Sequence, residues 1–194
     1  MQIEELIVKL SEDPFNPDIN FAVAREYEEL EQYASAVSFY MRAAEYGADV
    51  DGSLTVYTAL LKLARCFGEL GNRDHTVGTC LFQAIAYMPN RPEGYFLLSQ
   101  SLEYKKSWQE CYTWAKIGLA TATHYGLHPL PADVGYFGAY CLEFEMAVSS
   151  WWFGQKEESE RLFIELRKQE LAPIYKQAVE ANMRSLGMVW EFTD

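Results

Sequence analysis

The chain has 194 residues, of which 49% are hydrophobic and 15% aromatic, and this composition excludes a wholly disordered protein. Its formal net charge of −12 at pH 7 opposes binding to phosphate backbones and anionic lipids, so we expect neither nucleic acid nor a membrane as a partner. No segment approaches the roughly 20 apolar residues of a membrane-spanning helix. The N-terminal sequence shows no basic leader and no long apolar run, so the expected location is cytoplasmic.

The predicted elements are all helices, because apolar residues recur three and four positions apart and segments rich in Gly and Pro interrupt them. We expect about nine or ten helices in a single domain, with no strand. In chain order they form a capping helix at 1–12, helix pairs at 17–48, 53–89, 92–122 and 133–170, a second capping helix at 171–187, and a tail at 188–194.

The four helix pairs share one spacing pattern. In each first helix a large residue is followed, three positions later, by a large and a small residue. The small positions are Ala24, Ala64, Ser99 and Ala147. Small residues recur in the second helices too, as Ala115 and Gly118 do in "SWQECYTWAKIGL" (107–119). A small residue lets two helices approach closely, while its large neighbour fills the space beside it.

This pattern resembles the tetratricopeptide repeat, a 34-residue helix–turn–helix unit with the pattern W-x₂-L-G-x₂-Y…A-x₃-F…P. The resemblance covers residues 17–170. It implies an all-α fold, a right-handed superhelical stack of antiparallel helix pairs with about four repeats and capping helices. A lone repeat cannot bury its apolar face, so neighbouring repeats must stack.

The bulky and sulfur-containing side chains are expected in the core. In this register Trp108 follows the turn within its repeat, and Tyr112 and Trp114 pack against the flanking repeats, so we expect core aromatics rather than a cofactor site. The cysteines are Cys66, Cys80, Cys111 and Cys141. None belongs to a C-x-x-C pair, so we expect small buried side chains rather than zinc ligands or disulfides.

No constellation of catalytic residues stands out. His124 and His128 have a spacing that suits a metal on a helix, and Asp133 follows, but Gly and Pro residues make 123–135 a long loop. There is no Gly-rich phosphate loop and no G-x-S-x-G turn. We therefore expect no enzyme activity, catalytic residue, cofactor or metal. Long loops of this kind are often functional, and the role of 123–135 stays open.

The resemblance implies a non-catalytic scaffold that binds a protein or peptide on the concave face, which the first helices line. The family's groove positions fall on Phe21, Arg25 and Glu28, on Leu61, Arg65 and Glu69, on Phe96, Gln100 and Tyr104, and on Phe144, Val148 and Trp151. Relatives that clamp a peptide carboxyl terminus have Lys and Asn at several of these positions. Because Phe21 and Leu61 replace them, we expect no such clamp.

Two interpretations remain for the groove arginines. Arg25 and Arg65 occupy equivalent places in neighbouring repeats, where they could grip a carboxylate or phosphate of the ligand. Alternatively, each pairs internally with a nearby carboxylate, such as Glu28, Glu29 or Glu69. The sequence does not choose between these alternatives.

Two other functions are weighed against peptide binding. Residues 90–170, with "NRPE", Tyr140…Glu145-x-Ala147 and "WWFG", resemble tetratricopeptide segments that accompany some bacterial and viral glycosyltransferases. That likeness implies an accessory or sugar-binding module in which Trp151 and Trp152 stack on sugar rings. The third possibility is a homo-oligomer formed through the apolar tail residues Met188, Val189, Trp190 and Phe192, which otherwise fold back onto the array.

Overall fold

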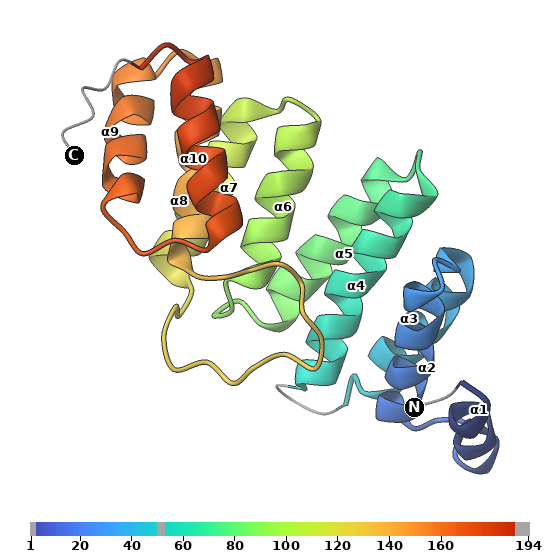
Figure 1. The fold of residues 1–194 in the computed structure, drawn as a ribbon. Helices are drawn as coiled ribbons and strands as arrows, with labels where there is room; N and C mark the ends of the chain where they lie inside the picture. Colours follow the sequence, from blue (N-terminus) through green and yellow to red (C-terminus); the bar gives the residue numbers. More distant parts are fainter. Residues whose placement is uncertain (1–2, 50–52, 189–194) are drawn as a thin grey trace. The chain divides into compact units, whose positions relative to one another are not determined.

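Figure 1 shows the computed structural model, which describes residues 3–49 and 53–188. Within these ranges the chain forms ten α-helices and no strand, so the predicted all-α class is confirmed. The helices are α1 (Ile3–Glu12), α2 (Pro17–Glu29), α3 (Tyr33–Tyr46), α4 (Leu54–Leu70), α5 (Asp74–Tyr87), α6 (Glu93–Tyr104), α7 (Trp108–Thr121), α8 (Ala139–Trp152), α9 (Lys156–Arg167) and α10 (Pro173–Ser185). None of the described helices combines the length and apolar character needed to cross a bilayer.

The chain divides into two compact units, a finer division than the single domain expected from the sequence. Unit 1 comprises Met1–Asn90 and Gly126–Val134, and unit 2 comprises Arg91–Tyr125 and Gly135–Asp194. In unit 1, α3 contacts both α2 and α4, α5 packs on α4, and α1 packs on α2. In unit 2, α7 contacts both α6 and α8, α9 packs on α8, and α10 contacts α8 and α9. Each unit therefore holds two helix pairs and one further helix.

Local sequence signals start helix α2. The side-chain oxygen of Asn16 accepts hydrogen bonds from the backbone N–H groups of Asp18 and Ile19, at 3.0 and 3.1 Å. Pro17 follows at the first helical position, where its missing N–H costs nothing. Helix α4 begins in a similar way, because the Ser53 hydroxyl oxygen accepts from the N–H of Val56.

The same turn closes all four helix pairs. Each pair is joined by three residues, and the middle one has a positive φ angle. These middle residues are Glu31 (58°), Asn72 (51°), Lys106 (59°) and Gly154 (92°). In three of the turns the next residue donates its N–H to a carbonyl five residues earlier, as Ser107 does to Leu102 at 2.9 Å. This bonding satisfies carbonyl groups at the end of the first helix and fixes where the second one starts.

Close approach between helices depends on the small residues that define the repeat. The small positions of the first helices are all buried, and so are Ala115 and Gly118 on α7. A Cβ atom added at Gly118 would lie 2.6 Å from Cβ of Tyr95 on α6 and 3.3 Å from Cδ1 of Leu142 on α8. No side chain fits there unless these helices move apart. Gly118 therefore sets the spacing of α7 from its neighbours on both sides.

We predict that Gly118→Ala lowers the free energy of unfolding of the full chain by about 1–3 kcal/mol, because the added methyl overpacks the contact with Tyr95. Gly78→Ala on α5 is the matched control, since a Cβ there would meet nothing within 4 Å. It should raise stability by about 0.5–1 kcal/mol through helix propensity. Urea denaturation of both variants measures the difference. Equal gains in stability would contradict the packing role of Gly118.

Candidate functional site

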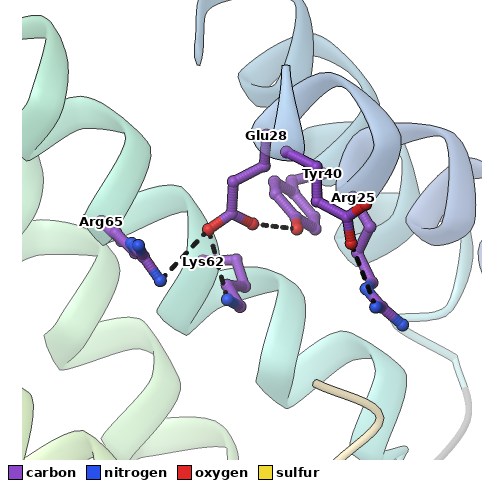
Figure 2. A network of polar contacts seen from close by, with 6 residues as sticks. Arg25, Glu28, Tyr40, Lys62 and Arg65 are labelled. Atoms are coloured by element: carbon purple, nitrogen blue, oxygen red, sulfur yellow. Dashed lines mark hydrogen bonds and ion pairs between the residues drawn. The ribbon is translucent and has the colours of Figure 1, made fainter. Parts of the chain in front are cut away.

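The first helices of unit 1 are joined by a buried charged network, which Figure 2 shows from close by. The Glu28 carboxylate accepts a hydrogen bond from the Tyr40 hydroxyl at 2.5 Å and one from the Lys62 ammonium at 3.2 Å. Arg65 contributes a third contact, at 3.5 Å. Only 10% of the Glu28 side chain and 8% of the Lys62 side chain are exposed. One carboxylate from α2 therefore ties together α3 and α4.

Burial is the first reason that the pKa of the Tyr40 phenol is raised far above its usual value, and its hydrogen bond to Glu28 is the second. The phenol therefore stays protonated and donates to Glu28 at every physiological pH. Because a buried ion that loses its partner keeps its desolvation cost, the network is sensitive to removal of a single member.

Each of the two groove arginines lies near a glutamate of the same chain, as in the second interpretation. Arg25 lies 3.5 Å from Glu29, and Arg65 lies 3.5 Å from Glu28. Arg25 and Glu29 are both exposed, so theirs is a surface ion pair with weak attraction, whereas the half-exposed Arg65 reaches the buried carboxylate of Glu28. Figure 2 shows that the two guanidinium groups point to different carboxylates.

Several expected groove residues belong to the hydrophobic core instead. Phe21, Leu61, Phe96 and Val148 are buried. Phe21 packs edge-to-face against Tyr40 on the second helix of its own pair, with ring centroids 5.4 Å apart. Phe96 packs against Tyr136 at 5.6 Å. These side chains have almost no surface to offer a ligand, because their helix faces turn toward neighbouring helices.

The remaining groove positions of unit 2 keep part of their surface. Tyr104 at the end of α6 is 85% exposed. Gln100, Phe144 and Trp151 are half-buried. Phe144 is packed between Phe163 and Tyr175, whereas Trp151 has the Lys156 ammonium over its ring at 4.8 Å. Tyr104 is thus the expected groove residue with the most accessible surface.

Two exposed aromatic side chains of unit 2, Tyr104 and Trp152, lie where α6 and α8 end, whereas Tyr125 and Phe137 are exposed between α7 and α8. Trp108 and Trp152 stack with ring centroids 5.6 Å apart and an interplanar angle of 22°. Trp152 is nevertheless 56% exposed. Close by, Tyr112 meets Phe153 edge-to-face at 5.4 Å. We call Tyr104, Trp108 and Trp152 the aromatic end of unit 2.

A buried carboxyl group lies deeper in unit 2 and was missed by the sequence interpretation. Glu145 on α8 is only 2% exposed. Its carboxylate accepts hydrogen bonds from the Gln100 side chain and from the Cys111 thiol, whose sulfur is 3.8 Å away. Burial and then the nearby charge of Glu103 raise the pKa of Glu145 to about 8. The signal was present in the sequence as a glutamate within the apolar run "CLEFEMAV".

His124 and the four cysteines are held inside the structure. Both ring nitrogens of His124 are engaged, one with the Tyr136 hydroxyl at 3.0 Å and the other with the Leu119 carbonyl at 3.3 Å. Among the described residues, no three side chains of metal-binding type cluster together. The four cysteines are free and buried, and burial raises the pKa of Cys66 to about 12. Such thiols are weak nucleophiles at neutral pH.

The C-terminal tail is described only at its start. Met188 is buried, and its N–H donates to the Met183 carbonyl at 3.0 Å, which continues the end of α10. The other tail residues expected to mediate self-assembly, Val189, Trp190 and Phe192, lie outside the described residues.

Solved structures of tetratricopeptide proteins share this fold. MamA matches with a TM-score of 0.65 and 12% identity over 86% of this chain and 85% of its own. PilF of Pseudomonas aeruginosa gives 0.64 and 10% over 92% and 72%. TTC0263, a thermophilic TPR protein of Thermus thermophilus, gives 0.59 and 13% over 96% and 89%. At these identities the likeness establishes a tetratricopeptide-like fold. A scan of protein-family models and a search of curated proteins found no match.

We predict that Lys62→Met destabilises unit 1 by about 3–5 kcal/mol, because Glu28 then keeps a buried charge without its ammonium partner. Adding Glu28→Gln to this variant should restore much of the loss, since no unpaired charge remains. Lys176→Met on α10, where the lysine is exposed, is the control and should change stability by less than about 0.5 kcal/mol. Chemical denaturation followed by circular dichroism provides the measurement. A cost for Lys62→Met no larger than that of the control would contradict the role of the network.

Proposed function

We propose that the chain is a non-catalytic scaffold that binds a segment of a partner protein at the aromatic end of unit 2. The tetratricopeptide-like fold supports this proposal, because stacked helix pairs present extended surfaces suited to peptide segments. Fold alone does not specify a function, so the argument rests on the surface itself.

The observation that carries the proposal is the exposure of large aromatic side chains at the ends of α6 and α8. Tyr104 is 85% exposed and Trp152 is 56% exposed, although both belong to types that usually bury most of their surface. Trp108 holds the Trp152 indole by stacking, so this ring loses little freedom on binding. Tyr and Trp residues with these properties dominate the energetics of protein interfaces.

The burial of the residues predicted to line the groove also argues for a binding surface elsewhere. Because Phe21, Leu61 and Phe96 have almost no accessible surface, they can make little contact with a ligand. A segment that lies across the aromatic end does not need contact with them. Its own apolar side chains would pack on the tyrosine and tryptophan rings.

We predict that peptides selected from a random phage library on the full chain bind the double variant Tyr104→Ala/Trp152→Ala at least about tenfold more weakly, because each truncation removes a hot-spot aromatic. Met41→Ala and Ile174→Ala are matched controls, since both side chains are large, apolar and exposed on other helices. Titration calorimetry should show less than about a twofold change for these controls. Selected peptides that bind the double variant as tightly as the unaltered chain would contradict the proposal.

Carbohydrate binding is a second candidate, favoured by the half-exposed indole of Trp152. Flat aromatic rings offer an apolar surface on which a sugar can stack. Trp108 already covers part of this indole, and Trp151 already holds a lysine ammonium, so the platform would consist mainly of one ring. The variant Tyr104→Ala/Trp152→Ala separates the two candidates. It should bind peptides more weakly if the first candidate is right, and glycans more weakly if the second is right.

A further inference from the structure

The charged contact of unit 1 has a counterpart of different chemistry in unit 2. Equivalent positions can be counted from the small residues of the first helices. Glu28 and Glu103 each lie four residues after the small residue of their own helix, Ala24 or Ser99. Lys62 and Glu145 each lie two residues before the small residue of the following first helix, Ala64 or Ala147. Unit 1 therefore places an ammonium beside a carboxylate. Unit 2 places a second carboxyl group at the lysine position.

The third member of the network is also replaced. Tyr40, which donates to Glu28, lies twelve residues after it, and the residue twelve positions after Glu103 is Ala115. Alanine has no hydroxyl group with which to support a carboxylate. The Cys111 thiol and the Gln100 amide instead donate to Glu145. At the positions in unit 2 that correspond to Lys62 and Tyr40, the chain has Glu145 and Ala115, so neither an ammonium nor a phenol stands there.

The groups that face Glu145 from the neighbouring helices are acidic or neutral. Helix α6 contributes Gln100 and Glu103, and α7 contributes Cys111. Helix α10 contributes the Tyr175 phenol, whose pKa is raised first by burial and partly by the charge of Glu145. On α9 the buried Ser159 hydroxyl donates to the Ala147 carbonyl of α8 at 2.6 Å. The charged group that acts most strongly on Glu145 is the Glu103 carboxylate.

We propose that Glu145, buried where α6, α7 and α8 meet, makes the packing of unit 2 sensitive to pH: the packing is stable while Glu145 carries a proton and weakens once Glu145 ionises. Glu145 is 2% exposed and lies where α6, α7 and α8 meet, so its charge cannot be relieved by water without separating these helices. The charge of Glu103 on α6 opposes the ionisation of Glu145 further.

The direction of the pH dependence follows from the raised pKa. In the unfolded chain Glu145 has an ordinary pKa of about 4.3, whereas in the folded chain it is raised to about 8. Burial raises the pKa of Glu103 as well. The folded state therefore binds protons more tightly than the unfolded state. Unit 2 is most stable below the unfolded pKa and loses stability as the pH rises through the folded one.

Tryptophan fluorescence isolates this unit, because all five tryptophans of the chain lie at position 108 or later. We predict that urea unfolding of the full chain, followed by tryptophan emission, has an unfolding constant at least about tenfold larger at pH 8 than at pH 5. Glu145→Gln should reduce this ratio to less than about twofold, since the amide keeps the shape of the side chain and cannot ionise. A ratio that stays as large in Glu145→Gln as in the unaltered chain would overturn the proposal.

Glu143→Gln is the matched control, because it makes the same change of net charge on α8 at a less buried residue, which bonds to Gln169. It should keep the full pH dependence of the unaltered chain. A second measurement does not depend on unfolding: the ¹³C chemical shift of the Glu145 carboxyl group, followed by NMR from pH 4 to 9. A titration midpoint above about 6 supports the proposal, whereas a midpoint near the ordinary value of about 4.3 overturns it.

Discussion

The structure depends on the close approach of helices at small residues. At Gly118 there is no room for even one additional carbon between α7 and Tyr95 on α6. The buried small positions of the first helices meet the same requirement. Because the helices lie so close, the side chains beside each small position are forced into fixed neighbours on the next helix. The positions of the charged network, the buried carboxyl group and the aromatic end all follow from that spacing.

One register therefore supports two kinds of chemistry. In unit 1 the positions between neighbouring first helices hold a carboxylate, an ammonium and a phenol that satisfy one another. In unit 2 the corresponding positions hold two carboxyl groups with neutral donors. Unit 1 uses its polar residues to stabilise the helix stack. Unit 2 has a buried carboxyl group, Glu145, with a raised pKa, and it has two exposed aromatic rings, Tyr104 and Trp152. Features of both kinds are associated with binding or regulation.

The elements were predictable because their signals are local. Small residues recur at a fixed spacing, and Gly, Pro and Asn mark the helix boundaries, so the all-α fold and the helix pairs could be read from the sequence. The faces of the helices were harder, because a shift of one residue turns a side chain by about 100°. This is why Phe21 and Leu61 were expected in the groove and lie in the core. The pairing of Arg65 with Glu28 joins two helices distant in sequence, and no local pattern specifies it.

The central claim is that the aromatic end of unit 2 is the surface at which a partner binds. Photo-crosslinking in living cells tests it most directly, with benzoylphenylalanine in place of Tyr104 or, for comparison, of the exposed Met41. We expect a discrete protein adduct from position 104 that disappears when Trp152→Ala is added, and none of comparable yield from position 41. Adducts from position 41 alone, or adducts from position 104 that persist in the Trp152→Ala chain, would contradict the claim.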